Sequence, residues 1–252
     1  LTVKARLGGE ELRRCYSICR SRSPAEISVA VKAIDGGRFS RYAQSDICQG
    51  MVLEVMVPQG HFGYQPQAGR EADYLAIAAG SGITPMMAII GATLATEAHS
   101  RFTLIYGNRS SSSMMFRQAL ADLKDRYPQR LQVVHLFSQE SMDSDLLQGR
   151  IDGDKLRALS ARLLDFSRFD EAFICGPAVM MDEAEAALRE LGMAENQIHL
   201  ERFNTPGSRA KRATGVQAEG RTVTIRQGGR DRQLALTAED ATIQDAAQRQ
   251  GA

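Results

Sequence analysis

The sequence has no tryptophan and few cysteines among its 252 residues. Its four cysteines form neither a C-x-x-C pair nor the evenly spaced framework of a secreted protein, which indicates reduced thiols rather than disulfides or structural zinc. No apolar run approaches the roughly 20 residues that cross a bilayer, and the charged first residues do not resemble a signal peptide. We therefore expect a cytoplasmic protein.

Net charge is also nearly absent. The 31 Lys and Arg residues balance 30 Asp and Glu residues, which leaves a formal net charge of +1. Such a chain creates no overall field that attracts nucleic acid or an anionic membrane, so we expect neither as a partner. The four histidines are scattered without the spacing of metal ligands, and we predict no metal site within this sequence.

The first part of the chain, residues 1–68, has little helical periodicity. Short β-type runs at 27–33 and 52–57 are separated by glycine and proline, which predicts an antiparallel β domain. A closed barrel of this kind needs about six strands, and only about four can be drawn here. Because an open barrel would leave a bare strand edge, we expect further strands before Leu1.

Residues 69–203 alternate buried strands with amphipathic helices. This alternation predicts a five-stranded parallel sheet with right-handed crossovers. The helix that begins at Ala178 has apolar residues at helical spacing, and Gly192 follows as a C-terminal stop. The predicted strands are 74–79, 102–107, 131–138, 171–176 and 198–203.

Residues 204–220 are polar, contain glycine and few large apolar side chains, and are therefore predicted to be an interdomain linker. Residues 221–252 begin a third unit, with a predicted hairpin around Gly228 and Gly229 and then a helix. The chain ends before this unit could close a core, so we expect it to continue beyond Ala252.

A glycine-rich turn joins the first predicted strand of the parallel sheet to a helix, in the order Gly80-x-Gly82-x-x-Pro85. Glycines allow a diphosphate to approach the backbone, and the helix N-terminus supplies free N–H groups and a positive dipole. The turn is a candidate dinucleotide site. A purely structural strand-to-helix turn would have the same residues, and this alternative stays open.

The loop after the second predicted strand has residues that distinguish NADPH from NADH. An acidic residue here would hold the ribose hydroxyls, whereas Arg109 and Ser110 suit a 2′-phosphate. We therefore favour NADPH. The alternative is a solvated loop whose serines only begin a helix.

Two segments of the β domain have the residues of a flavin and anion site. Arg14, Tyr16 and Ser17 would place a cation, an aromatic ring and a hydroxyl on alternating faces of one strand. These groups can hold a diphosphate, stack on a ring system and hydrogen-bond a flavin nitrogen, respectively. Gly36 and Gly37 then open a short helical segment, which is a second candidate anion site. Each segment is also compatible with ordinary strand or turn sequence.

Taken in order, five motifs resemble the ferredoxin–NADP reductase family, and within it the reductase subunits of multicomponent oxygenases. The resemblance covers nearly the whole chain. It implies a mixed β and α/β fold, in which an N-terminally incomplete FAD-binding β-barrel precedes a five-stranded parallel Rossmann-like NADP-binding domain and the start of a β-grasp ferredoxin domain. The motifs are R-x-Y-S (14–17), G-G-R-F-S (36–40), G-S-G-I-T-P (80–85), Y-G-N-R (106–109) and C-G-P (175–177).

The resemblance also implies roles for residues of the β domain. Arg14, Tyr16 and Ser17 would bind FAD, and Ser17 would also act as a catalytic residue beside the flavin ring. The FAD pyrophosphate would lie at Gly37, Phe39 and Ser40.

In the parallel domain, the resemblance places Thr84 at the flavin and nicotinamide, and Arg109 and Ser110 at the 2′-phosphate. Cys175 would lie near the nicotinamide as a second catalytic residue, and a small thiol packed in the core is an equal alternative. The other cofactor-binding residues implied are Lys32, Gly80, Gly82, Gly176 and Pro177.

The family implies that hydride passes from NADPH to FAD, and that single electrons then pass through a 2Fe-2S cluster to an oxygenase partner such as an epoxidase component. The C-x4-C-x2-C pattern of a plant-type cluster is not in this sequence, so we expect the cluster only in a longer parent protein. Two alternatives remain: a stand-alone NAD(P)H:flavin or ferredoxin reductase, and a noncatalytic dinucleotide-binding module.

Overall fold

The computed structural model describes residues 1–23, 25–203, 220–227, 230–237 and 243–250. The chain divides into two compact units, Leu1–Phe203 and Asn204–Ala252, and each is described by itself. The predicted linker at 204–220 lies outside the described residues except for Gly220.

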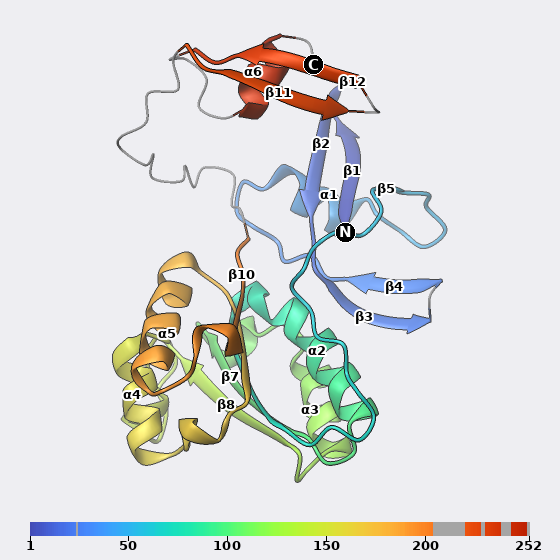
Figure 1. Cartoon of the computed structure of the whole chain (residues 1–252). Helices are drawn as coiled ribbons and strands as arrows, with labels where there is room; N and C mark the ends of the chain where they lie inside the picture. Colours follow the sequence, from blue (N-terminus) through green and yellow to red (C-terminus); the bar gives the residue numbers. More distant parts are fainter. Residues whose placement is uncertain (24, 204–219, 228–229, 238–242, 251–252) are drawn as a thin grey trace. The chain divides into compact units, whose positions relative to one another are not determined.

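The N-terminal region forms antiparallel sheets, as predicted (Figure 1). Strands β1 (Thr2–Leu7), β2 (Glu10–Cys15) and β5 (Glu54–Val55) make one sheet in the order β2-β1-β5, and β3 (Ile18–Ser23) pairs with β4 (Glu26–Val29) in another. Helix α1 (Arg38–Ser45) contributes Phe39 to a small core with Val3 and Leu12.

Two strands of this region are shorter than predicted. The run at 27–33 is a strand only to Val29, and the run at 52–57 is a strand only over Glu54–Val55. Val52 and Val57 are 92% and 79% exposed, and β5 pairs with β1 through only two residues. The β propensity of a valine depends on packing against neighbouring strands, so without that packing the strand does not extend.

All five predicted strands of the parallel sheet are present. They are arranged in the order β10-β9-β6-β7-β8, and every neighbouring pair is parallel. The central strands β6 and β7 are buried along nearly their whole length because helices cover both faces of the sheet. The strands are β6 (Asp73–Ala79), β7 (Arg101–Asn108), β8 (Leu131–Phe137), β9 (Glu171–Cys175) and β10 (Ile198–Glu201).

The helices lie in two layers. Helices α2 (Ile83–Thr96) and α3 (Arg117–Arg126) pack on one face of the sheet, and α4 (Gly153–Arg162) and α5 (Ala178–Glu190) pack on the other (Figure 1). Helix α5 confirms the pattern predicted for it, because Met181, Ala184 and Leu188 are buried. Gly192 follows with φ +100°, a conformation that favours glycine and ends the helix.

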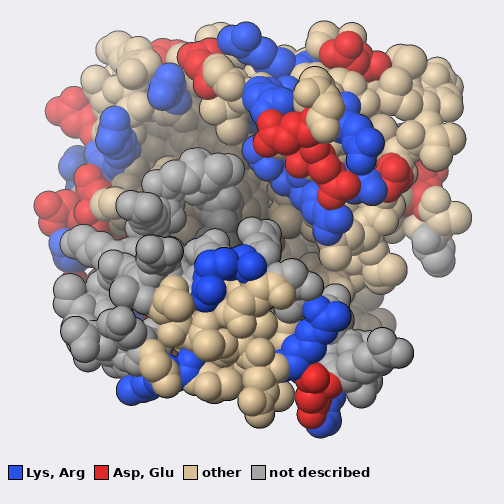
Figure 2. All heavy atoms as spheres, turned by 90° about the horizontal axis from the view of Figure 1, so that it is seen from above, with Lys and Arg blue, Asp and Glu red and all other residues tan. Residues whose placement is uncertain are grey.

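The second unit contains the predicted hairpin. Strands β11 (Thr222–Gln227) and β12 (Arg230–Ala235) are antiparallel, with Thr222 opposite Ala235, and helix α6 (Ile243–Arg249) follows. The turn glycines at 228–229 lie outside the described residues. In the described parts of both units, no helix is long and apolar enough to cross a bilayer. Basic and acidic side chains are interspersed on the face shown in Figure 2, in keeping with the net charge of +1.

A buried carboxylate fastens the segment that enters the parallel sheet. Glu97 follows α2 and accepts hydrogen bonds from the hydroxyls of Tyr64 (2.7 Å), Tyr74 (2.8 Å) and Ser100 (2.6 Å) and from the N–H of Gln67 (3.0 Å). Burial alone would raise the pKa of the Glu97 carboxyl, but these donors outweigh burial, and the pKa is lowered. The ionised carboxylate thus holds the segment before β6 against β6 and α2.

We expect Glu97→Gln to lower the free energy of unfolding by about 2–3 kcal/mol at pH 7. The neutral amide oxygen accepts weaker hydrogen bonds than a carboxylate, and the amide NH2 group would face hydroxyl and N–H groups that are themselves donors. The pKa of Glu97 is lower in the folded state than in the unfolded state. Its contribution is therefore complete above the ordinary carboxyl range and is lost as the pH falls through the folded-state pKa. Urea unfolding at several pH values should show the difference between the two proteins shrinking as the pH falls.

Tyr64→Phe is the matched control for this measurement. It removes one of the donors and leaves the carboxylate in place, so the loss should be about 1 kcal/mol. If the Glu97→Gln protein is as stable as the unaltered protein at pH 7, the Glu97 carboxylate does not stabilise the fold.

Candidate active site

The candidate site lies at the carboxyl end of the parallel sheet, between β6 and β9. The order β10-β9-β6-β7-β8 reverses direction at these two strands. Open parallel sheets bind ligands at the carboxyl ends of strands where the order reverses. The turn that begins at Gly80 follows β6, and Gly176 and Pro177 follow β9, so two of the predicted motifs meet here.

Gly82 brings the start of α2 against the end of β9. A Cβ atom on Gly82 would lie 2.0 Å from the carbonyl oxygen of Cys175 and 2.9 Å from the nitrogen of Gly176, so no other residue fits without a shift of backbone. Gly80 has φ +55°, which also favours glycine, and Pro85 lies in the first turn of α2 as predicted. Among the described residues, no side chain caps this helix, and its positive dipole end points to the turn. The Ile83 N–H already donates to the Ser81 carbonyl and Pro85 has no N–H, so few backbone donors of this first turn are left for a ligand.

Thr84 and Cys175 are buried beneath this turn. Thr84 is 4% exposed, and its hydroxyl donates to the carbonyl oxygen of Ser81 at 3.0 Å. Cys175 is completely buried, and burial, followed by the negative charge of Glu201, raises the pKa of its thiol. The thiol is therefore neutral at physiological pH and is not a nucleophile.

Glu201 connects the β domain to this edge of the sheet. The Ser17 hydroxyl donates to Glu201 Oε2 at 2.8 Å, and Glu201 pairs with Cys175 in the register of β10 and β9. Burial raises the pKa of the Glu201 carboxyl, and the hydrogen bond from Ser17 opposes this effect. Ser17, Cys175 and Glu201 are thus brought together from three distant parts of the chain.

The sequence prediction did not include Glu201. The available signal was an acidic residue at the end of an otherwise apolar strand, because the carboxyl ends of parallel strands meet at one edge. Its hydrogen-bond partner, Ser17, lies 184 residues away in the chain, so the pair itself has no local signature.

The R-x-Y-S motif differs from the prediction of a single strand. Strand β2 ends at Cys15, and Tyr16 continues its pairing with the β1 side: the Tyr16 N–H donates to the Leu1 carbonyl at 2.9 Å, and the Leu1 nitrogen donates to the Tyr16 carbonyl at 2.8 Å. Ser17 lies beyond this pairing, between β2 and β3, and β3 pairs with β4 in another sheet. The ring of Tyr16 packs 5.8 Å from that of Phe39, while Ser17 reaches the parallel domain. The predicted single strand is therefore present as far as Tyr16, and only Ser17 lies outside it.

Gly36 and Gly37 form the predicted turn before α1. A Cβ atom on Gly37 would lie 2.4 Å from Ser40 Oγ and 2.9 Å from the Ile34 carbonyl oxygen. Ser40 Oγ accepts from the Ile34 N–H and donates to the Gly37 carbonyl, each at 3.2 Å, and Phe39 is buried in the core. These two side chains shape the turn. Because the Gly37 N–H already donates to the Ile34 carbonyl at 2.9 Å, an anion would have to contact the amides at the start of α1.

Lys32 lies beside two of the turns at the carboxyl end of the sheet. Its Nζ donates to the carbonyl oxygen of Ser113 at 3.4 Å and lies 4.0 Å from the Cβ position of Gly80. Within the described part of the chain, no carboxylate pairs with it. A cation between two turns at this edge suits a diphosphate.

The loop after β7 combines the predicted basic residue with an unpredicted acid. Arg109 is exposed, and Ser110 begins a 3-10 turn, η2 (Ser111–Ser113), in which the Ser110 N–H donates to Ser113 Oγ at 3.1 Å. Glu140, from the segment after β8, accepts a hydrogen bond from the Ser111 N–H at 2.6 Å. Both charges are therefore placed where an adenosine ribose would lie on an α/β sheet.

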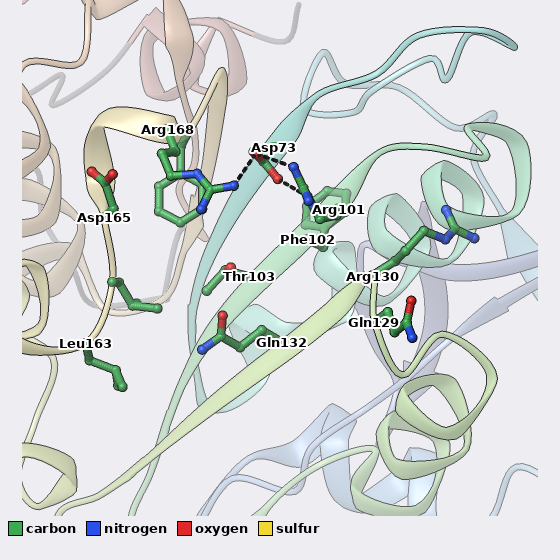
Figure 3. A pocket seen from close by; sticks show the side chains of 12 residues that line it. Asp73, Arg101, Phe102, Thr103, Gln129, Arg130, Gln132, Leu163, Asp165 and Arg168 are labelled. Carbon is green, nitrogen blue, oxygen red and sulfur yellow. Dashed lines mark hydrogen bonds and ion pairs between the residues drawn. The ribbon is translucent and has the colours of Figure 1, made fainter.

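A pocket of about 260 Å³ at the other end of the sheet does not belong to this site (Figure 3). It lies at the amino ends of β6, β7 and β8, where the Asp73 carboxylate pairs with Arg101 at 2.8 Å and Arg168 at 3.6 Å. Within the described ranges, no group of three or more His, Cys, Asp and Glu residues could hold a metal ion.

Comparison with known proteins identifies the family. The model of the oxidoreductase NAD-binding domain matches residues 76–186. Over all 252 residues, the chain is 71% identical to a subunit of the 1,2-phenylacetyl-CoA epoxidase of Escherichia coli (strain K12) and covers 71% of that protein. It is 38% identical over 193 residues to the ferredoxin reductase component of the 3-ketosteroid-9-alpha-monooxygenase of Mycolicibacterium smegmatis, and this match covers 76% of the chain and 50% of that relative.

The fold comparison agrees with this result. The FAD/NAD binding domain of nitric oxide dioxygenase from Vibrio cholerae aligns with a TM-score of 0.68 and 28% identity, covering 80% of this chain and 82% of that one. The resemblance predicted from five sequence motifs, to the ferredoxin–NADP reductase family and to the reductase subunits of multicomponent oxygenases within it, is confirmed. The chain belongs to the ferredoxin–NADP reductase family of flavoprotein oxidoreductases, in the group of the phenylacetyl-CoA epoxidase reductases.

Proposed function

We propose that the protein is the reductase component of a phenylacetyl-CoA epoxidase, accepting hydride from NADPH and delivering electrons to an oxygenase partner in aerobic phenylacetate catabolism. One observation carries the proposal: the hydrogen bond from Ser17 to Glu201 joins the predicted flavin segment to the carboxyl edge where the glycine turns lie. A flavin held by the β domain and a nicotinamide held by the parallel sheet would meet at this edge.

The residues at this edge fit a nicotinamide dinucleotide and FAD. The positive dipole end of α2, the close approach at Gly82 and the ammonium of Lys32 suit a dinucleotide diphosphate. Arg14, Tyr16 and the amides at the start of α1, directly after Gly37, would hold FAD. When bound, FAD supplies the conversion of a two-electron hydride donor into a source of single electrons.

The chain's own contribution is mainly positioning. Glu201 accepts the Ser17 proton in a hydrogen bond, which fixes the direction of the Ser17 hydroxyl at the place where the rings would meet. Cys175 is neutral and buried, so its contribution is structural: its backbone packs against Gly82 below the site. No general base is required among these residues, because hydride leaves the nicotinamide without a separate proton.

The proposal extends to the domains and to the electron path. Residues 1–68 would be the FAD-binding domain, 69–203 the NADP-binding domain, 204–220 the linker and 221–252 the start of a 2Fe-2S ferredoxin domain. The 71% coverage of the Escherichia coli relative leaves room for such a domain in the parent protein. A stand-alone reductase remains the alternative, and a C-x4-C-x2-C pattern downstream in the full-length gene would exclude it. A noncatalytic dinucleotide-binding module would not need the Arg14–Ser17 segment.

Flavin content tests the assignment of the β domain. We expect Arg14→Ala to lower the FAD content of the purified full-length protein several-fold, because a charge-assisted contact to the diphosphate is lost. Arg13→Ala is the matched control, since this neighbouring guanidinium already pairs with Glu11 at 2.8 Å. Equal FAD content in both variants, measured by visible absorbance, would favour the noncatalytic module.

A second prediction concerns Ser17 and Glu201. We expect Ser17→Ala to slow flavin reduction by NADPH on the order of 10-fold or more while changing the KM for NADPH little, because orientation is lost and nucleotide binding is not. Because the pKa of Glu201 is raised, the rate in the unaltered protein should fall as the pH drops into a range just above that of an ordinary carboxyl.

Glu201→Gln cannot titrate and should lose this acid limb of the pH profile. The same limb in Glu201→Gln and in the unaltered protein would show that another group titrates, and that Glu201 does not set the Ser17 hydroxyl.

A third prediction separates the diphosphate contact from the 2′-phosphate contact. We expect Lys32→Gln to raise the KM for NADPH and NADH by similar factors, because both nucleotides share the diphosphate. Arg109→Gln should raise the KM for NADPH alone, by roughly 10- to 100-fold for one charge-assisted contact. Steady-state assays with ferricyanide as acceptor measure both. If Arg109→Gln affects the two nucleotides equally, Arg109 does not contact the 2′-phosphate.

A further inference from the structure

Glu140 accepts a backbone hydrogen bond in the turn that follows Arg109 and Ser110. Its Oε2 accepts from the Ser111 N–H at 2.6 Å, a distance typical of a strong, charge-assisted hydrogen bond. Ser111 is the first residue of η2, directly after the predicted 2′-phosphate residues Arg109 and Ser110. The carboxylate therefore lies against the backbone of the same loop that contains Arg109, a residue of opposite charge.

The backbone holds Glu140 in this position. Beyond the end of β8, the Ser138 N–H donates to the Asn108 carbonyl at 3.0 Å and the Gln139 N–H donates to the Arg109 carbonyl at 2.8 Å. These bonds continue the pairing of β7 and β8 up to the residue before Glu140. The carboxylate is thus held beside the η2 turn by its backbone and by its own hydrogen bond.

The two nicotinamide nucleotides differ only at the position that these charges border. A ribose 2′-hydroxyl can donate a hydrogen bond, and a carboxylate accepts one well. A 2′-phosphate has about −1.5 to −2 charges near pH 7, so Arg109 attracts it, Glu140 repels it, and it finds the Ser111 N–H already in use.

We propose that Glu140 is a specificity-determining residue that restrains the preference for NADPH and keeps NADH usable as a hydride donor. This inference rests on the proposed function, because it requires the adenosine ribose to bind at the carboxyl ends of β7 and β8. Arg109 attracts the 2′-phosphate, and Glu140 limits the ratio of the affinity for NADPH to the affinity for NADH.

Isothermal titration calorimetry of the FAD-loaded full-length protein with 2′,5′-ADP and 5′-AMP tests the proposal without hydride transfer. Glu140→Gln keeps an oxygen acceptor for the Ser111 N–H, removes the charge and adds an amide donor. We expect it to lower the Kd for 2′,5′-ADP about 10-fold or more, as removal of one close like charge predicts. The Kd for 5′-AMP should stay the same or rise.

Asp143→Asn is the control, because Asp143 is an exposed carboxylate of the same segment. It should leave both Kd values unchanged, which excludes a general effect of net charge. The ratio of kcat/KM for NADPH to that for NADH should rise in Glu140→Gln by the same factor as the binding ratio.

The outcomes are distinct. If both nucleotides bind and Glu140→Gln leaves the ratio of their Kd values unchanged, the proposed role of Glu140 is wrong and the proposed function still stands. An equal gain for both nucleotides, or the same gain in Asp143→Asn, also overturns it. If neither nucleotide binds to the unaltered protein, both the inference and the proposed dinucleotide site are wrong.

Discussion

The close approach of Gly82 to the backbone of Cys175 is the contact on which the rest of the site depends. It places the N-terminus of α2 directly against the end of β9, at the point where the strand order reverses. Both strands at this point are buried between helices on the two faces of the sheet, so close packing on both sides sets the position of the turn.

Around this fixed point, the two halves of the first unit contribute different groups. The β domain supplies Ser17 and Lys32, and the parallel sheet supplies Glu201 and the turn after β7. Cations lie near the turns where phosphates would bind, and the acidic Glu201 lies where an uncharged ring system would be. This distribution suits a protein whose chemistry is performed by bound cofactors and whose own task is to hold two rings face to face.

Much of this architecture was predictable because its signals are local. The five parallel strands follow from continuous apolar runs, and the glycine turn follows from spacing directly after the first of them. The strand at 52–57 was predicted too long because exposure of Val52 and Val57 depends on partner strands, which a propensity does not contain. The position of Ser17 beyond the end of β2 was missed for the same reason, since it depends on the pairing of β3 with β4 in a separate sheet. Glu201 and Glu140 could not be paired with Ser17 and Ser111 from sequence, because each pair joins segments distant in the chain.

The central claim is that the flavin segment and the dinucleotide turns converge on one edge of the parallel sheet. Anaerobic rapid mixing of the FAD-loaded full-length protein with NADPH, followed through the visible flavin absorbance, tests it most directly. Convergence predicts that the flavin bands bleach at a rate that rises with NADPH concentration and then saturates. A protein that holds FAD and binds NADPH, yet keeps its oxidised flavin spectrum, would contradict the account.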